Sequence, residues 1–423
     1  MSWLWFPILL LPPLQPPNPQ RAMVAALEGR ELAKTQAHLE QLTRREPTNA
    51  RTWVQLAQVY SQRKKTEQAL AAAAKAEALG GDDPGVLHEL ANLFIELQPD
   101  LKKAAALEER YAEKTPEDRT AWRRVAALYL DAGLPEQAIA AGRHGLVNDA
   151  SPELRTILGQ AYTAVEDWDN AAAQLRAALR PGHSDEEAHF RLAQMYMLRR
   201  DYPHAVEVLA NARQMFGKSP QVELALGVCY YGLQRYGDAV DEFLKAIALA
   251  PDAPQAYVLL GRILEHAGER LPEATQRFVE FNESNPTNAL GYMLHAKALL
   301  ARFGGAEERA PEAEADQALG LLRKSLALKA DGAEARFLMG CVLEGKRQYK
   351  AAAEELEKSI ALNPQGPVAH LRLAEVYEQL GRAEDAARER ALHRKLAAAE
   401  QAAPDNALGL DPPVPAGVAH RKP

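Results

Sequence analysis

The pattern of apolar and polar positions repeats along most of the chain, and a small residue marks each period. This small residue stands at Ala57, Ala91, Ala126, Gly159, Ala193, Gly227, Gly261, Ala296, Gly340 and Ala374. The successive steps are 34, 35, 33, 34, 34, 34, 35, 44 and 34 residues. A fixed period of this length is the sequence signature of a stacked repeat architecture.

Further positions keep the same period. The residue before the small one is usually apolar, as at Leu226, and the residue three places after it is large, as at Tyr230. A second ladder of alanines runs through Ala69, Ala104, Ala138, Ala171, Ala205, Ala239, Ala274, Ala318, Ala352 and Ala386. Apolar residues three and four apart lie on one helical face, so each period predicts two antiparallel helices. Small residues let these two helices approach closely.

Proline or glycine interrupts the pattern where we expect helices to stop. These residues are Pro47, Gly80, Gly81, Pro116, Pro152, Pro181, Pro220, Pro251, Pro286, Gly332 and Pro364. Proline removes a backbone donor and clashes with the preceding turn. One helix–turn–helix unit cannot bury its apolar faces alone, whereas stacked units can. The sequence therefore predicts an all-α fold, a solenoid of about ten helix–turn–helix repeats.

The N-terminal segments differ from the repeats. Residues 1–20 carry a short apolar run followed by prolines, which is typical of a secretory signal peptide or of a disordered leader. The apolar run is too short to span a bilayer, which takes about 20 residues. Residues 21–47 predict an N-terminal capping helix, or a degenerate half-repeat, ahead of the solenoid at 48–382.

Two other segments depart from the regular period. The 44-residue step places an insertion at about 303–316, which we expect to be a solvated loop. Residues 383–403 predict a C-terminal capping helix, because Arg390 stands where Phe243 stands in its counterpart and a terminal repeat needs a polar outer face. Residues 404–423 are rich in proline without apolar periodicity and predict a disordered tail.

The pattern resembles the tetratricopeptide repeat (TPR) family over about residues 50–400. The family pattern is W-x-x-L-G-x-x-Y, then A-x-x-x-F and a closing proline. Its fullest match here runs through Leu226, Gly227, Tyr230, Ala239, Phe243, Ala246 and Pro251. The resemblance implies a right-handed α-superhelix with a concave groove. It implies no particular ligand, because one fold serves many functions.

Composition and charge narrow the classes of function. The 423 residues are 47% apolar and 25% charged, so a folded chain is expected. Fifty Lys and Arg against 57 Asp and Glu give a net charge of −7, and this lack of a basic surplus disfavours nucleic-acid binding. Two cysteines without a C-x-x-C pair disfavour a disulfide scaffold and a zinc module. A membrane span is not expected.

The sequence contains no motif typical of catalysis or cofactor binding, whether a P-loop, a zinc-protease motif or a nucleophile elbow. His88 and Glu89 begin like a zinc-protease motif, but Asn92 stands where the second histidine is required. His295 occupies a leucine position and is expected to be buried and hydrogen-bonded, and Cys229 to be a free core thiol. We therefore predict no enzymatic activity, no cofactor and no metal ion.

Some members of the family bind acidic C-terminal tails through a clamp of Lys and Asn side chains. Asn92 fits this clamp, but His88 stands at its lysine position and Arg124 at its next asparagine position. Glu153 and Ile157 stand where the third repeat of the clamp has cations. The clamp is incomplete, which disfavours a role as a chaperone co-factor.

The resemblance places the groove on the first helix of each repeat. The predicted partner-binding residues are Phe190, Arg191, Gln194, Met197, Leu224, Tyr231, Val258, Arg262, Met293, Lys297 and Phe337. An exposed apolar stripe marks a binding site, so we expect the groove to take an extended or helical segment of a protein partner. The alternative is that half of these side chains pack against neighbouring helices.

The leading prediction is a non-enzymatic scaffold for a protein partner whose identity the sequence does not reveal. Two alternatives stay open. One is a regulatory or substrate-presenting subunit of a separately encoded enzyme, and the other is a solenoid that self-associates into a homo-oligomer. The alanine- and arginine-rich composition and the apolar leader favour a bacterial source and export to the periplasm over a cytoplasmic location.

Overall fold

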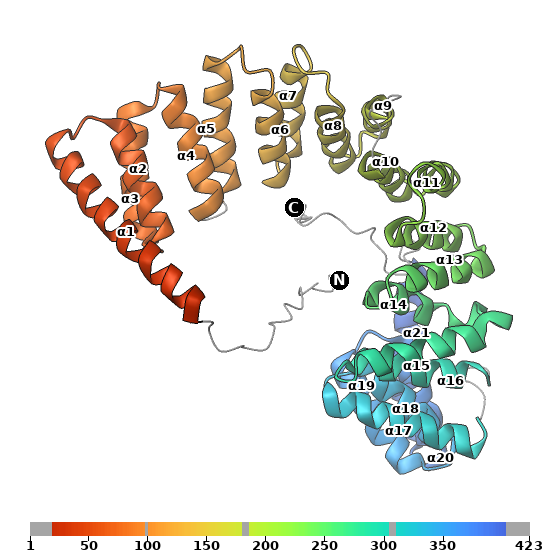
Figure 1. Cartoon of the computed structure of the whole chain (residues 1–423). Helices are drawn as coiled ribbons and strands as arrows, with labels where there is room; N and C mark the ends of the chain where they lie inside the picture. The colour runs from red at the N-terminus through yellow and green to blue at the C-terminus, as the bar shows by residue number, and fades with distance from the viewer. Residues whose placement is uncertain (1–18, 98–99, 180–185, 304–309, 403–423) are drawn as a thin grey trace. The chain divides into compact units, whose positions relative to one another are not determined.

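A computed structural model describes residues 19–97, 100–179, 186–303 and 310–402 (Figure 1). Within these ranges the chain forms helices α1 to α21 and two short 3₁₀ turns, and no strand. No helix in the described part is long and apolar enough to cross a bilayer. The predicted leader and tail lie outside the described residues, apart from Pro19 and Gln20 at the start of α1.

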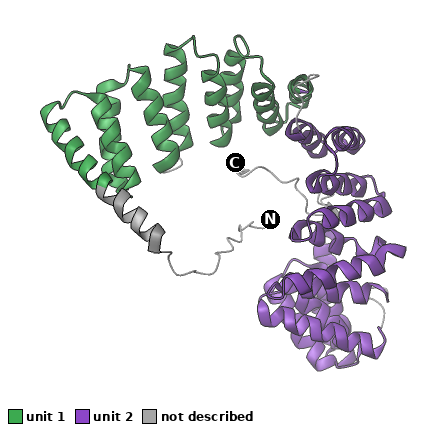
Figure 2. Cartoon of the chain, viewed as in Figure 1, with its two compact units in different colours: residues 1–178, 415–423 green, residues 179–414 purple. Residues whose placement is uncertain are grey.

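The helices divide into two compact units, with α1 to α9 in unit 1 and α10 to α21 in unit 2 (Figure 2). Unit 1 consists of α1 Pro19–Arg45, α2 Ala50–Gln62, α3 Thr66–Gly80, α4 Pro84–Leu97, α5 Leu101–Lys114, α6 Ala121–Asp131, α7 Pro135–Gly145, α8 Pro152–Ala164 and α9 Trp168–Ala178.

Unit 2 begins with α10 Glu186–Leu198, α11 Tyr202–Phe216, α12 Pro220–Gly232, α13 Tyr236–Leu249 and α14 Pro254–Arg262. It continues with α15 Leu271–Ser284, α16 Ala289–Ala301, α17 Glu312–Leu328, α18 Ala333–Gly345, α19 Tyr349–Leu362, α20 Pro367–Gln379 and α21 Ala383–Ala402. From α2 onward the helices form adjacent pairs, first helix and second helix, as the period predicts, except that α14 packs on α13 and α16 rather than on α15. The predicted all-α repeat fold is confirmed.

Gly159, Gly227 and Gly340 lie where the two helices of a pair meet, whereas Gly261 lies where α14 meets α16. A Cβ built on Gly159 of α8 would lie 2.4 Å from Leu175 Cγ of α9, and one on Gly227 of α12 would lie 2.5 Å from Phe243 Cε1 of α13. Real Cβ atoms do not approach a side chain this closely, so the pairs close only because a small residue stands there. Packing at this density explains the strictness of the ladder.

The turn between the two helices has one backbone conformation in the seven regular repeats. The residue seven places after the small one, here called the turn residue, has a positive φ. The turn residues and their φ angles are Lys64 59°, Gly133 70°, Glu166 59°, Arg200 62°, Gln234 59°, Arg347 60° and Gly381 74°. The next residue donates its N–H to the carbonyl five places back, as Arg235 does to Tyr230 at 2.9 Å. This is a Schellman motif, which normally favours glycine.

In three repeats more residues separate the small residue from the second alanine. In the repeat of Gly261 the second alanine follows after 13 residues instead of 12, and the chain beyond α14 winds into the 3₁₀ turns Leu264–His266 and Gly268–Arg270. The repeat of Ala91 has the same extra residue. In the insertion predicted at 303–316, residues 304–309 lie outside the described ranges. Residues 312–316 belong to α17, so this part of the insertion is helical and not the expected loop.

Two of the predicted helix stops are also corrected. Pro152 and Pro220 are the first residues of α8 and α12 rather than stops. Proline is well suited to the first helical position, because its missing N–H would have no partner there and its φ already matches the helix.

Adjacent repeats are joined by a recurring tyrosine–glutamate hydrogen bond. Tyr60 of α2 donates to Glu40 of α1 at 2.8 Å, and Tyr377 of α20 donates to Glu357 of α19 at 2.7 Å. Tyr129 of α6 does the same to α5. Burial, reinforced by the glutamate, raises the pKa of Tyr60 and Tyr377 to about 12. Since α1 offers Glu40 as α19 offers Glu357, α1 packs on α2 as the second helix of a repeat would.

Candidate protein-binding face

The eleven predicted partner-binding residues lie on α10, α12, α14, α16 and α18, all first helices of unit 2. We call these eleven residues the binding face. Its half-buried apolar members are Phe190, Leu224, Tyr231, Val258 and Phe337. Leu224, Tyr231 and Phe337 also pack against the core of unit 2, so each of them offers only part of its surface to solvent.

Three members of the binding face are buried. Gln194, Met197 and Met293 are each 7% exposed. The helices that carry them, α10 and α16, bury residues around most of their circumference. These three side chains therefore stabilise unit 2 rather than form its surface, which corrects their assignment as contact residues.

The cations of the binding face differ in how they are paired. Arg191 Nε lies 2.6 Å from Glu187 Oε1, and Lys297 Nζ lies 2.7 Å from Glu334 Oε1. Arg262, at the end of α14, is exposed and has no ion-pair or hydrogen-bond partner among the described residues. Arg262 is thus the cation of this face whose charge is available to another molecule.

A charged cluster lies on α18 and α20, which are also first helices of unit 2. The sequence analysis did not identify this cluster. Arg372 Nη1 lies 3.1 Å from Glu375 Oε2. Burial raises the pKa of Glu344 and the charge of Glu375 adds to this, while Arg372 opposes it. Arg372 and Glu375 flank Ala374, and this position beside a small residue was the signal that could have identified them.

The polar first helices of unit 1 hold their charges internally. Glu108 of α5 is 2% exposed. Its Oε1 accepts a hydrogen bond from Arg124 Nε at 2.6 Å, and its Oε2 lies 2.8 Å from His88 Nδ1. Arg124 also contacts Asp118 at 2.8 Å. Burial alone would raise the pKa of Asp118, but hydrogen bonds from Arg124 and Thr120 outweigh it and hold the pKa well below its usual range. Arg124 is therefore saturated by carboxylates of its own chain.

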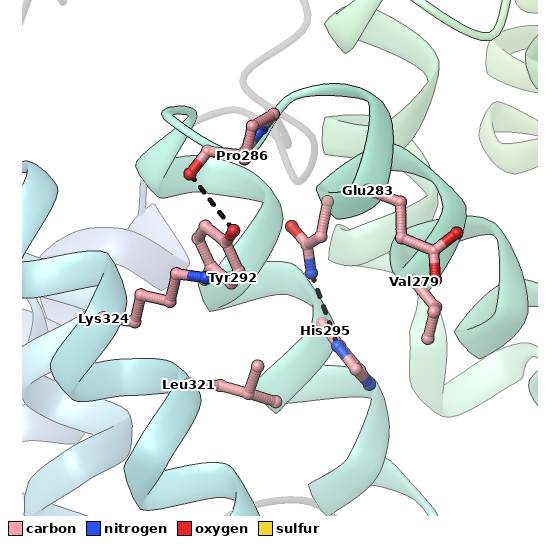
Figure 3. A pocket seen from close by; sticks show the side chains of 8 residues that line it. Val279, Glu283, Pro286, Tyr292, His295, Leu321 and Lys324 are labelled. Atoms are coloured by element: carbon pink, nitrogen blue, oxygen red, sulfur yellow. Dashed lines mark hydrogen bonds between the residues drawn. The ribbon is translucent and has the colours of Figure 1, made fainter.

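A separate pocket of about 360 Å³ lies between α15, α16 and α17 (Figure 3). Its lining residues are Val279, Asn282, Glu283, Pro286, Tyr292, His295, Leu321 and Lys324. Lys324 Nζ lies 4.2 Å from the ring centroid of Tyr292. The same arrangement recurs at Trp53 and Lys75 of unit 1, at 4.5 Å, so this wall of the pocket is a structural element of the repeat.

His295 is one of the residues that line this pocket. It is half-buried and accepts a hydrogen bond from Asn282 Nδ2 at 3.4 Å, so the expected hydrogen bond is present but burial is incomplete (Figure 3). Burial lowers the pKa of His295, which keeps the ring neutral at physiological pH. Asn282 Oδ1 has no partner and lies against Gly291, where a Cβ would be 2.3 Å away.

The described residues contain no group of three or more His, Cys, Asp or Glu side chains placed to hold a metal ion. Both thiols, Cys229 and Cys341, are free and buried, as expected for Cys229. Burial raises the pKa of each thiol to about 12. A protonated, buried thiol is a poor nucleophile, so the cysteines behave as core residues.

Sequence profiles described as tetratricopeptide repeat match residues 50–79, 158–220, 224–278 and 343–389. No protein of curated function matches the chain. Among solved structures, a TPR protein of Cytophaga hutchinsonii is 16% identical, with 59% of this chain and 98% of that chain covered and a TM-score of 0.47. A thermophilic TPR protein of Thermus thermophilus is 26% identical, with coverages of 45% and 100% and a TM-score of 0.37.

Yeast Tom70 is 15% identical to this chain, with coverages of 84% and 96% and a TM-score of 0.36. At these TM-scores the assignment depends on the matched profiles and on the repeated helix pairs. The ladders of small residues and alanines extend the same architecture between the matched segments. The chain belongs to the tetratricopeptide repeat family and is a protein-interaction scaffold.

Proposed function

We propose that this scaffold is non-enzymatic and binds a segment of a partner protein on the binding face of unit 2. The tetratricopeptide repeat is in general a non-catalytic scaffold whose members bind protein partners. The half-buried apolar side chains of α10, α12, α14 and α18 supply apolar contact area. The face differs from an ordinary soluble surface, because its half-buried apolar members recur on the first helices α10, α12 and α14, and again on α18.

Arg262 is the observation that carries the proposal. It is exposed and without a partner among the described side chains, next to the half-buried Val258 one turn earlier on α14. Arginine beside apolar surface is enriched at the energetic centres of protein interfaces, because it combines charge, hydrogen bonding and stacking. A carboxylate or a backbone carbonyl of the partner would bind there.

Site-specific photo-crosslinking tests this assignment. A benzoylphenylalanine in place of Gln255, which is exposed two turns before Arg262 on α14, would report on the binding face. The same group in place of Leu328, 42% exposed on the second helix α17, is the matched control. We expect crosslinks from the first position and none from the second. Adding Arg262→Glu should lower the crosslink yield from the first position by at least about fivefold.

Each outcome decides between functions. One partner crosslinked only from α14, and lost with Arg262→Glu, supports the proposal. If that partner is an enzyme, the chain is a regulatory or substrate-presenting subunit, and if it is a second copy of the chain, the solenoid self-associates. Crosslinks that are equal from both positions, or that persist with Arg262→Glu, contradict a site at this face.

A further inference from the structure

Two buried carboxyl groups, one on α12 and one on α13, contact the same arginine of α11 in unit 2. Glu223 of α12 is 1% exposed and Glu242 of α13 is 5% exposed. Arg213 Nη1 of α11 lies 3.2 Å from Glu223 Oε2 and 3.4 Å from Glu242 Oε1. Lys245, half-exposed on α13, lies 3.0 Å from Glu242 Oε1. We call these four residues the carboxyl joint.

The carboxyl joint differs from the last two repeats at the equivalent places. In those two repeats a basic side chain on the first helix faces a carboxylate on the second. Arg336 of α18 meets Glu355 of α19 at 2.8 Å, and His370 of α20 meets Glu389 of α21 at 2.6 Å. In α12 the cation is replaced by Glu223, so the compensating charge comes from Arg213 in the preceding repeat.

This replacement makes the joint sensitive to protons. Burial raises the pKa of Glu223, the hydrogen bond and charge of Glu242 raise it further, and Arg213 opposes both. Two carboxyl groups can share a hydrogen bond only when one of them is protonated. Loss of that proton leaves two like charges in a site that excludes water, and this disfavours the packed arrangement.

We propose that the carboxyl joint is a proton-operated latch that holds α11 against α12 and α13. With a proton on Glu223, the Glu223 hydroxyl donates to the Glu242 carboxylate while Arg213 and Lys245 balance its charge. Without it, two buried carboxylates repel each other beside the same Arg213 Nη1, while Lys245 compensates only Glu242 from a half-exposed position, and the joint loosens. The charged groups that face Glu223 are Glu242 from α13 and Arg213 from α11, and Lys245 acts only through Glu242.

The latch has a consequence for the binding face, and this consequence alone rests on the proposed function. Phe190 and Arg191 lie on α10, the helix paired with α11, whereas Leu224 and Tyr231 lie on α12. A loosened joint lets the α10–α11 pair shift against α12. The protonation of Glu223 would therefore set how well the two halves of the face align.

The direction of the pH effect follows from the raised pKa. The folded joint favours the neutral form of Glu223, so its contribution to stability is fully present below about pH 4.5, the ordinary value. It is lost as the pH rises through the raised pKa of the folded state. A higher pH therefore opens the joint, and a lower pH closes it.

Hydrogen–deuterium exchange on the full chain tests the latch. Protection factors, which are corrected for the intrinsic pH dependence of exchange, would be measured for α11 and α12 between about pH 4.5 and pH 8. Because the pKa of Glu223 is raised in the folded joint, we expect protection to fall severalfold as the pH rises across this range. In Glu223→Gln, whose amide donates to Glu242 at every pH, protection should not change with pH.

Glu344→Gln is the matched control, because burial also raises the pKa of that carboxyl but it lies on α18. It should leave the pH profile of α11 and α12 as in the parent chain. Arg213→Gln removes the opposing cation and should steepen that profile, which gives a second reading if Glu223→Gln folds poorly. A parent profile that does not change with pH, or an equal slope in Glu223→Gln, overturns the latch. Neither result bears on crosslinking at α14, so the two proposals fail separately.

Discussion

The turn residue offers the sharpest test of how the helix pairs are built. Five of its seven occupants are Lys64, Glu166, Arg200, Gln234 and Arg347, each with φ near 60°. All five side chains are exposed and form no hydrogen bond or ion pair within the described chain. Changing Arg347 to glycine therefore removes backbone strain without removing a contact.

The expected magnitude is the difference of two terms. A residue with a Cβ costs about 1–2 kcal/mol in the left-handed region, and glycine avoids this cost. Glycine in turn makes the unfolded chain more flexible, at a cost of about 0.5–1 kcal/mol. We therefore expect Arg347→Gly to raise the free energy of unfolding by about 0.5–1 kcal/mol. The five replacements should add, because they lie in different repeats and share no contacts.

Urea unfolding followed by circular dichroism would measure this change. Glu354→Gly is the matched control, because Glu354 is exposed in the interior of α19, close to Arg347, and glycine there should cost about 1 kcal/mol. Gly133→Ala, at a turn residue that is already glycine, should also destabilise. If Arg347→Gly destabilises as much as Glu354→Gly does, strain at the turn residue is not the cause.

Three further predictions address packing, ionisation and reactivity. Gly227→Ala should lower the free energy of unfolding, measured in urea, by about 1–3 kcal/mol, because the added Cβ would meet Phe243. Gly320→Ala should raise the free energy of unfolding by about 0.5–1 kcal/mol, because a Cβ there would have nothing within 4 Å. Stability should fall between about pH 10 and 12, because the tyrosines ionise at lower pH in the unfolded chain than in the folded one. In thermal melts, Tyr60→Phe combined with Tyr377→Phe should reduce this loss. An unchanged dependence of the melting temperature on pH would contradict the raised pKa values. Cys229 and Cys341 should react with a thiol-specific disulfide reagent only after urea unfolding, and rapid reaction of the native chain would contradict their burial.

Much of the fold could be predicted because its determinants are local and repeated. The small residues, the large residues and the alanines each recur at nearly the same spacing, so irregularities at single positions, such as His295 in place of leucine, did not hide the pattern. The close contact of Gly227 with Phe243 joins a member of the first ladder to the residue four places after Ala239 of the alanine ladder. Helix pairs therefore follow from the sequence alone.

The turn conformation could not be predicted in the same way. Glycine occupies the turn residue at Gly133 and Gly381, but lysine, glutamate, arginine and glutamine occupy it elsewhere with the same φ. The backbone conformation there is imposed by the two helices that close on each other, through tertiary contacts. Residue identity at this position carries little information about it.

The candidate site was only partly predictable because burial depends on neighbouring repeats. Gln194 stands at the place equivalent to that of Arg262, and Met293 at that of Val258, yet α10 and α16 bury them. Charge pairing is equally non-local, since Arg124 of α6 is neutralised by Glu108 of α5. A period of 34 residues fixes which helix carries a side chain, and it leaves the rotation of that helix undetermined.

The tyrosine–glutamate bonds between repeats have a consequence under mechanical load. Tyr60, Tyr129 and Tyr377, which are buried or half-buried, each tie a first helix to a glutamate of the second helix before it. When such an array is pulled lengthwise, helix pairs detach one after another, and the junctions with this extra tie bear the largest force before they yield. Within unit 1 the tied junctions α1–α2 and α5–α6 would act as stops, so extension would proceed in discrete steps between them.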